Sequence, residues 1–337
     1  MSRIRLAGAT RAAIVIGALA LFPFLVGQQW VQIGVLTLMY AGLATAWNLV
    51  GGYAGYVSLG HVAFFGVGAY AVAVAFTRWF SIGGGYRPFY VLPLIGIGVA
   101  LVSVPIGWIA FRTRAATFAI VTLTLLFVVQ QLAFNLHSLT QGSLGILLPQ
   151  PSFPNSEYEQ PFYYAMLGLL VLGLLVSRWV ATSKLGLTLF AIRDDEDRAR
   201  GLGERVTQAK LIAFALSTGL AGMIGAVWAY HLGQIYPQFA VDPLITIGMV
   251  LMVYLGGKGS LWGPVLGALI LVPAQQELAY DYGSSELYLI AYAGVFLLVM
   301  LVMPRGILPS LTEQWRRRSS RGRSARPSQP TEEPATS

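Results

Sequence analysis

Long apolar stretches recur along nearly the whole chain, and they constrain its fold more than any other feature. A helix needs about 20 mainly apolar residues to cross a bilayer, and about ten stretches approach that length. They are 12–27, 30–50, 61–80, 89–111, 115–136, 161–180, 210–231, 243–257, 261–280 and 286–304. Only 11% of the 337 residues are charged, against about 25% in soluble domains. The sequence therefore predicts an all-α polytopic membrane protein with about eight to ten transmembrane helices.

Two places depart from a simple span. The 243–257 stretch is short enough to be a half-helix, and the glycine-rich segment 51–60, GGYAGYVSLG, interrupts two spans. Irregular backbone at membrane depth is tolerated only where it is buried in protein or lines a cavity. The segment is therefore either a broken helix along a substrate path or a tight turn between spans. The candidate pathway residues here are Gly52, Gly55, Ser58, Gly60 and His61, although a lone histidine is also typical of a hydrogen-bonded structural role.

Positive charges predict the orientation of the chain. With the N-terminus inside and ten alternating spans, every Lys and Arg except Arg78 and Arg87 falls on the inner side. Such a bias is the mark of cytoplasmic loops, so we expect both termini in the cytoplasm. The N-terminal apolar stretch resembles a signal peptide, but it is longer than a usual signal core and no small-residue cleavage pattern follows it. It is interpreted as a retained first span.

The C-terminal residues have a different character from the rest. We expect residues 1–310 to form the transmembrane domain and residues 311–337 to form a disordered basic cytoplasmic tail, because the tail is rich in Arg, Pro, Ser and Thr. A basic tail after a last span is typical of an anchor beside anionic lipid of the membrane. We therefore attribute much of the net charge of +8 to this anchor and expect no nucleic-acid partner.

The segment 183–210 is the one dense group of charges between two apolar stretches. A mixed-charge helical segment on the cytoplasmic side of a membrane is typical of a docking element for a soluble partner. The alternative is a solvated helical loop without a partner. Its 11 charged residues are Lys184, Arg193, Asp194, Asp195, Glu196, Asp197, Arg198, Arg200, Glu204, Arg205 and Lys210.

Several function classes are disfavoured by what the apolar stretches lack. No acidic residue falls within the middle of a span, whereas ion-coupled carriers usually keep an ionisable group at membrane depth. A stand-alone ion-coupled carrier or channel is therefore the weaker alternative. With no cysteine and three scattered histidines, we expect no metal site. The GGKGS segment, 256–260, lacks the spacing of a phosphate-binding loop, so we do not expect this chain to bind ATP. The sequence also lacks a pattern of nucleophile and base that would indicate an enzyme.

Four segments in order resemble the membrane permeases of branched-chain amino-acid ABC importers, of the LivM type, to which urea and short-amide permeases are closely related. The resemblance covers most of residues 30–310. The segments are NLVGGYAGYVSLGHVAFFGVGAYAV (48–72), TFAIVTLTLLF with LTQGSLGI (117–127 and 139–146), the charged segment with its continuation to about residue 227, and VLMVYLGGKGSLWGPVLGA with MPRGIL (250–268 and 303–308).

The resemblance implies a multi-subunit importer in a bacterial plasma (inner) membrane. Such importers combine two related permeases, two cytoplasmic ABC ATPase subunits and an external solute-binding protein, so ATP is expected on the partner subunits and no cofactor on this chain. The segment 183–210 is similar to the importers' coupling helix, with Arg198 where the family often has Ala. The expected ATPase-coupling residues are Ala191, Ile192, Arg193, Asp194, Asp195, Glu196, Ala199 and Gly203, with the small side chains forming a face that seats on the ATPase.

The external loop LTQGSLGI departs from the family pattern. Gln141 stands where the family commonly has a glycine, and Leu144 where it has an acidic or amide residue. Thr140 and Ser143 of this loop are further candidate pathway residues. The departure bears on the substrate: branched-chain or other hydrophobic amino acids are expected first, and urea or short amides remain the alternative.

Overall fold

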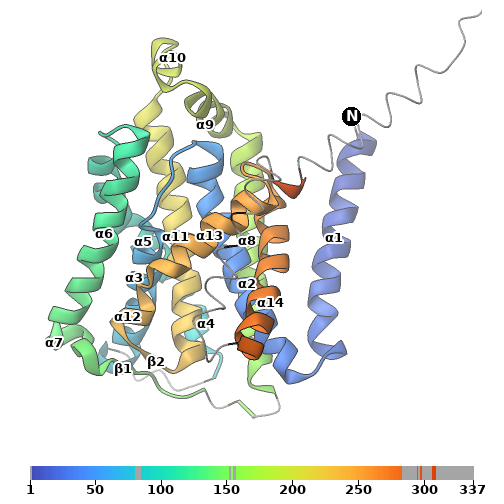
Figure 1. Cartoon of the computed structure of the whole chain (residues 1–337), viewed down its shortest axis with the longest axis vertical. Coiled ribbons are helices and arrows are strands. Elements are labelled where there is room, and N and C mark those ends of the chain that lie inside the picture. Colours follow the sequence, from blue (N-terminus) through green and yellow to red (C-terminus); the bar gives the residue numbers. More distant parts are fainter. Residues whose placement is uncertain are drawn as a thin grey trace, which may run out of the picture.

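The structure, a computed structural model, describes residues 2–79, 85–151, 153–154, 157–282, 294, 297 and 306–308. Within these residues the chain forms a bundle of long helices (Figure 1). Seven helical segments are long and apolar enough to cross a membrane, which confirms the all-α polytopic fold. They are Gln28–Tyr53, His61–Arg78, Leu92–Ala110, Ala115–Asn135, Glu159–Thr182, Val206–Leu232 and Pro237–Gly256.

The first half of the bundle is built from hydrophobic helices joined by short turns. Its long helices are α1 (Ser2–Leu25), α2 (Gln28–Asn48), α3 (His61–Val74), α5 (Leu92–Ala110) and α6 (Ala115–Asn135). Two of them end in π-helical turns, η1 (Leu49–Tyr53) after α2 and η2 (Ala75–Trp79) after α3. Short elements complete this half: α4 (Arg87–Tyr90), α7 (His137–Thr140), the 3-10 turn η3 (Gly142–Leu144) and the strand β1 (Ile146–Leu147).

The second half contains the charged segment and the remaining spans. Its elements are α8 (Glu159–Thr182), α9 (Lys184–Asp194), α10 (Glu196–Gly201), α11 (Val206–Leu232), β2 (Gln234–Ile235), α12 (Pro237–Ala240), α13 (Pro243–Gly256) and α14 (Gly263–Tyr282). The 14 residues of α13 rise about 21 Å, less than the roughly 30 Å of a bilayer core. Together with α12 they form the segment Pro237–Gly256, which is long enough to cross a membrane, so the half-helix stays a prediction. Apart from residues 294 and 297, the expected span 286–304 lies outside the described residues, as does the tail 311–337.

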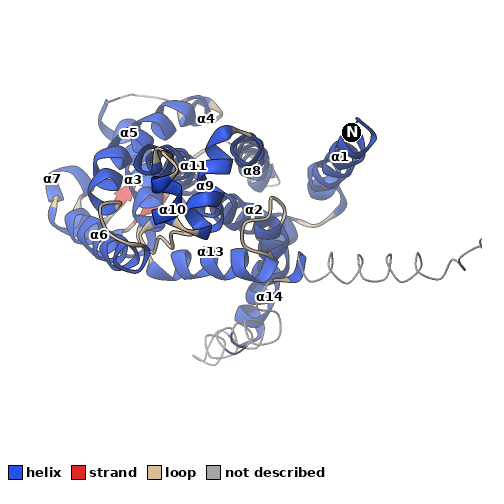
Figure 2. Ribbon diagram, turned by 90° about the horizontal axis from the view of Figure 1, so that it is seen from above, coloured by secondary structure: helices blue, strands red, loops and turns tan. Residues whose placement is uncertain are grey.

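Helix α11 is the centre of the bundle. It packs against α3 and α5 along their length, and glycines make this approach close: a Cβ on Gly225 would lie 2.0 Å from the backbone oxygen of Phe65. Small residues at helix contacts are favoured in lipid, where no hydrophobic drive brings helices together. By contrast α1 lies at the edge of the bundle (Figure 2), where Tyr163 donates a 2.7 Å hydrogen bond to the Leu19 carbonyl.

The two ends of the bundle differ. Helices α9 and α10 form one end, which we call the coupling end (Figure 1). At the far end lie α7 and the two short strands, which pair antiparallel with Ile146 opposite Ile235; we call this the β end. Helix α11 starts next to α10 and runs to β2, so its 27 residues, about 40 Å of helix, connect the two ends.

Candidate functional site

The charged segment 183–210, which we call the coupling segment, folds as two short helices rather than as a single one. Helix α9 ends at Asp194, and Asp195 adopts an extended backbone that separates it from α10. The Asp195 carboxylate accepts a 3.0 Å hydrogen bond from the Arg198 backbone N–H. Asp195 is thus the N-cap of α10 and satisfies one of the free amides at a helix start. The sequence therefore fixes a sharp change of direction in the middle of the coupling segment.

A buried ion pair ties α10 to the start of α11. The Lys210 Nζ lies 2.9 Å from the Glu196 Oε1, and the Lys210 side chain is only 1% exposed. Tyr56 joins them: its hydroxyl donates a hydrogen bond to Glu196 Oε2 and accepts one of 3.1 Å from Lys210 Nζ. We call these three residues the brace. The charge count assigned Lys210 to the cytoplasmic side; in the structure Glu196 and Tyr56 satisfy its charge inside the protein.

The brace keeps Glu196 ionised. Partial burial on its own would raise the pKa of this carboxyl, but hydrogen bonds from Tyr56 and Lys210 and the positive charges of Lys210 and Arg200 outweigh that effect and lower the pKa below its usual value. The pKa of the Tyr56 hydroxyl is raised by burial and by the Glu196 carboxylate that accepts its hydrogen bond. Tyr56 is therefore the neutral donor and Glu196 the charged acceptor.

A second contact joins the coupling segment to the glycine-rich segment 51–60. The Arg193 guanidinium donates a 3.0 Å hydrogen bond to the Gly52 carbonyl. Gly55 also lies against Arg193, because a Cβ built on it would be 3.2 Å from the arginine Cγ. The sequence indicated both segments as functional but gave no sign of contact between them. In the structure Arg193 of α9 binds the Gly52 carbonyl and Glu196 of α10 binds the Tyr56 hydroxyl, so both helices contact residues 51–60.

The break between α2 and α3 is confirmed. Helix α2 continues into the π-helical turn η1, and residues 54–60 that follow are irregular and mostly buried. Side chains from other elements satisfy this backbone: Trp47 Nε1 donates to the Ser58 carbonyl at 2.7 Å, and the Leu59 N–H donates to Thr122 Oγ1 at 3.0 Å. Gly60 lies so close to the Thr122 carbonyl that a Cβ there would be 2.1 Å from it. The segment is thus irregular backbone buried in protein, and its pathway role stays a prediction.

His61 has the hydrogen-bonded structural environment that was the alternative to a pathway role. It is fully buried, and its Nε2 lies 2.6 Å from Ser217 Oγ. Ser217 has one proton and donates it to the Ala46 carbonyl, so His61 Nε2 carries a proton and donates to the serine. Ser58 is also fully buried, and within the described residues its hydroxyl has no hydrogen-bond partner.

Thr140 and Ser143 do not join the other candidate pathway residues. Phe118, near the start of α6, packs against the Tyr56 ring at 5.3 Å, whereas Thr140 follows the other end of the 21-residue α6, about 30 Å away along the helix. The Thr140 hydroxyl is used locally, as it donates to the Ala133 carbonyl at 2.6 Å. Thr140 and Ser143 therefore lie far along α6 from residues 51–60, and their pathway role stays a prediction.

The expected small face of the coupling segment points inward. Ala199 is only 1% exposed and Ile192 is also buried, so neither side chain is available to a partner. The exposed apolar group is instead Leu202, 84% exposed, directly after α10. Next to it Gly203 has a φ of +86°, a left-handed conformation that favours glycine. Ala191, Arg193, Asp194 and Asp195 remain at least partly exposed.

Sequence reasoning missed a second buried contact between an acidic and a basic side chain, at the β end of α11. His231 Nε2 lies 2.7 Å from Glu159 Oε2, and both side chains are largely buried. Tyr158 adds a 2.9 Å hydrogen bond to the His231 carbonyl. The two partners are 72 residues apart, and no spacing rule connects them. The signal in the sequence for this contact was the presence of a histidine and a glutamate in a mainly apolar chain.

Comparison with known proteins decides the family. The model of the family described as "Branched-chain amino acid transport system / permease component" matches residues 29–303. The chain belongs to this family. It is 29% identical to the LivM high-affinity branched-chain amino acid transport system permease protein of Salmonella typhimurium, over 90% of this chain and 75% of the relative. The LivM protein of Escherichia coli is also 29% identical, over 87% of this chain and 73% of the relative.

A third relative widens the comparison within the family. The LivH permease protein of Salmonella typhimurium is 24% identical, over 83% of this chain and 94% of the relative. No solved structure matches the chain. The family assignment and the membrane-crossing helices together make the chain a multi-pass transport permease of the bacterial inner membrane. The resemblance to LivM-type permeases is therefore confirmed.

Proposed function

We propose that this chain is the permease subunit of an ATP-driven importer that carries branched-chain or other hydrophobic amino acids. The names of the LivM and LivH relatives support that substrate class. The proposed assembly contains a second related permease, two cytoplasmic ATPase subunits that bind and hydrolyse ATP, and an external solute-binding protein. The chain itself supplies the membrane path and no cofactor.

The coupling end is the proposed ATPase docking surface. Helix α10 projects from the bundle (Figure 1), and its exposed residues combine charges such as Asp197 and Arg200 with the exposed Leu202. An apolar anchor surrounded by charges is typical of a protein interface, because the anchor contributes affinity and the charges select the partner. Leu202 therefore takes the place at the ATPase contact that the resemblance implied for the small side chains of this segment.

The single observation that carries the proposal is the double contact between the coupling segment and residues 51–60. Glu196 holds Tyr56, and Arg193 holds the Gly52 carbonyl. A movement of α9 and α10 by a partner is thereby transmitted to the buried broken helix without passing through a flexible linker. Such direct packing through paired groups is a physical route for coupling between sites.

Charge supports an orientation with the coupling end in the cytoplasm. The α5–α6 turn carries Arg112 and Arg114, and the α13–α14 turn carries Lys258. Phe111 and Phe118, which flank the first turn, pack against Tyr56, and Gly259 in the second turn lies against Arg193. Basic turns thus gather at one end of the bundle, as the positive-inside rule requires of a cytoplasmic face. Both termini are placed on this side in the proposed topology.

Substitution of Leu202 tests the docking surface. The change Leu202→Asp is expected to lower association of the purified chain with its ATPase subunits at least tenfold, because it places a charge at an apolar anchor. Leu144→Asp is the matched control: Leu144 is 79% exposed at the β end, and its replacement should leave ATPase binding unchanged. Equal effects of the two changes, or none from Leu202→Asp, would contradict docking at α10.

Reconstituted vesicles test the substrate class. With ATPases and binding protein present, ATP-driven uptake of leucine, isoleucine and valine is expected, and uptake of urea is not. Urea transport under the same conditions would replace amino acids with short amides as the cargo. Uptake driven by an ion gradient in vesicles that contain this chain alone would overturn the ATP-driven assignment.

A further inference from the structure

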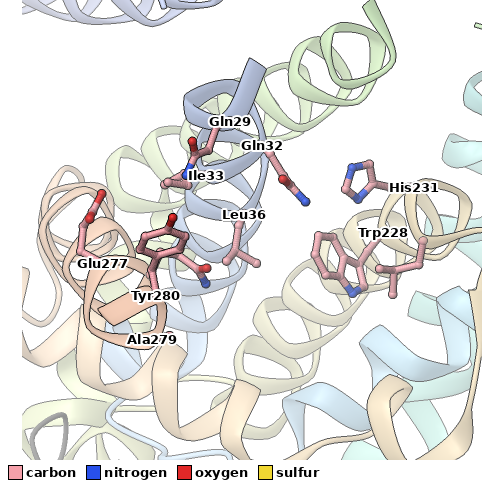
Figure 3. Close-up of a pocket in the computed structure, with 11 residues that line it drawn as sticks. Gln29, Gln32, Ile33, Leu36, Trp228, His231, Glu277, Ala279 and Tyr280 are labelled. Atoms are coloured by element: carbon pink, nitrogen blue, oxygen red, sulfur yellow. The ribbon is translucent and has the colours of Figure 1, made fainter. Parts of the chain in front are cut away.

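A polar cavity opens at the β end, away from the coupling segment. It has a volume of about 420 Å³ and lies between the ends of α2, α11 and α14. Figure 3 shows Glu277 of α14 on one side, His231 and Trp228 of α11 on the other, and Gln29 and Gln32 of α2 between them. Small-molecule sites commonly have volumes of roughly 300–1,000 Å³. The cavity is large enough for a single amino acid.

His231 forms part of one wall of this cavity (Figure 3). Its side chain is only 7% exposed, and Nε2 lies 2.7 Å from the Glu159 carboxylate. Its Nδ1 is buried and has no hydrogen-bond partner among the described residues. The Glu159 contact therefore holds the imidazole in place as part of the wall, and the polar groups offered to a ligand come from the other helices.

The remaining polar groups match the two charges of an α-amino acid. Glu277 brings a carboxylate to the cavity, and none of the ion pairs found among the described residues uses it. It suits an ammonium group. Gln29 and Gln32 carry amide N–H donors, which suit a carboxylate. Figure 3 shows Gln29 and Gln32 between Glu277 and His231, so the groups for both ligand charges line one space.

The rest of the lining is apolar. Ile33, Leu36 and Trp228 line the cavity together with the polar groups, and a branched aliphatic side chain would be removed from water against them. Neither Lys nor Arg is among the described lining residues, so an anion without an ammonium group would face Glu277 uncompensated. The lining therefore favours a zwitterion with an apolar side chain over a plain carboxylate.

We propose that this cavity binds a zwitterionic apolar amino acid at the β end, with Glu277 on its ammonium group and the α2 amides of Gln29 and Gln32 on its carboxylate. The inference rests on the proposed function, in which the β end faces the external binding protein. It adds a defined site where the cargo is received.

Equilibrium binding tests the site. The full chain is placed in lipid nanodiscs, and binding of radiolabelled leucine is measured in competition with 4-methylpentanoate, which lacks the ammonium group. The change Glu277→Gln is expected to weaken leucine binding about tenfold and to leave 4-methylpentanoate binding unchanged or tighter, because only the ammonium contact is lost. Glu157→Gln, which removes another exposed carboxylate outside the cavity, is the matched control and should bind leucine as the wild type does.

The outcomes separate this site from the wider function. Absence of saturable leucine binding to the wild-type chain, or equal weakening of both ligands by Glu277→Gln, overturns the site. Displacement of bound leucine by urea contradicts the requirement for a zwitterionic ligand. If ATP-driven leucine uptake by the assembled importer survives Glu277→Gln with unchanged half-saturation, the cavity fails and the proposed function stands. If the assembled importer carries no branched-chain amino acid, the proposed function fails irrespective of the cavity.

Discussion

Each end of α11 carries a contact between a basic and an acidic side chain, but the two contacts differ in how fully their polar atoms are paired. At the coupling end Lys210 pairs with Glu196, and the Tyr56 hydroxyl completes the arrangement with bonds to both partners. At the β end His231 pairs with Glu159, but its Nδ1 has no partner among the described residues. They also differ in their surroundings. The brace makes its bonds within the chain and holds α10 to α11, whereas the Glu159–His231 pair lies at the wall of the cavity that is proposed to receive a ligand.

The completeness of the brace predicts a large loss when one member is removed. Lys210→Met should leave Glu196 without its buried cation. Breaking a buried pair typically costs about 3 kcal/mol or more, and the partial exposure of Glu196 places this case near the lower limit. Thermal unfolding of the purified chain measures the loss, and the double change Lys210→Met with Glu196→Gln should recover part of it because the orphaned charge is gone.

Arg205→Met provides the comparison for that experiment. Arg205 is an exposed cation just before α11, and its replacement is expected to change stability by less than about 0.5 kcal/mol. If the two single variants unfold alike, the brace is not a structural element and the contrast between the two ends of α11 is lost.

A smaller effect is expected from pH. The pKa of Glu196 is lowered in the folded protein, so its stabilising contribution is fully present above the unfolded pKa of about 4.3 and is lost as the pH falls through the folded value. The difference in unfolding temperature between wild type and Glu196→Gln should be constant from neutral pH to about pH 5 and then shrink on acidification. A difference that grows on acidification would show that the carboxyl is not the charged partner.

Much of the fold could be predicted because its signals are local. Apolar length identified the spans, and the glycines at 51–60 identified the break between α2 and α3. The orientation of α10 could not be predicted in the same way. Its sequence, EDRARG, has charges at most positions, so no apolar periodicity indicates that Ala199 faces inward. The exposed Leu202 lies just beyond the helix, in a position that a helical pattern does not assign.

The candidate site was predicted less well because its contacts are remote in sequence. Tyr56 and Glu196 are 140 residues apart, and Glu159 and His231 are 72 apart. Their pairing depends on how α3, α8 and α11 pack, and helix spacing rules act only over one or two turns. The family resemblance indicated a coupling segment at 183–210, and that role stays a prediction. It did not indicate that Glu196 makes its main contacts inside the chain.

The most direct test of the account is the amount of leucine transported per ATP hydrolysed by the reconstituted importer carrying Tyr56→Phe. This change removes the hydroxyl that joins Glu196 to residues 51–60 and keeps the aromatic ring in place. The account predicts a clear fall in that ratio, with ATPase association and leucine binding both at wild-type levels. A ratio equal to that of the wild type would contradict transmission through the brace.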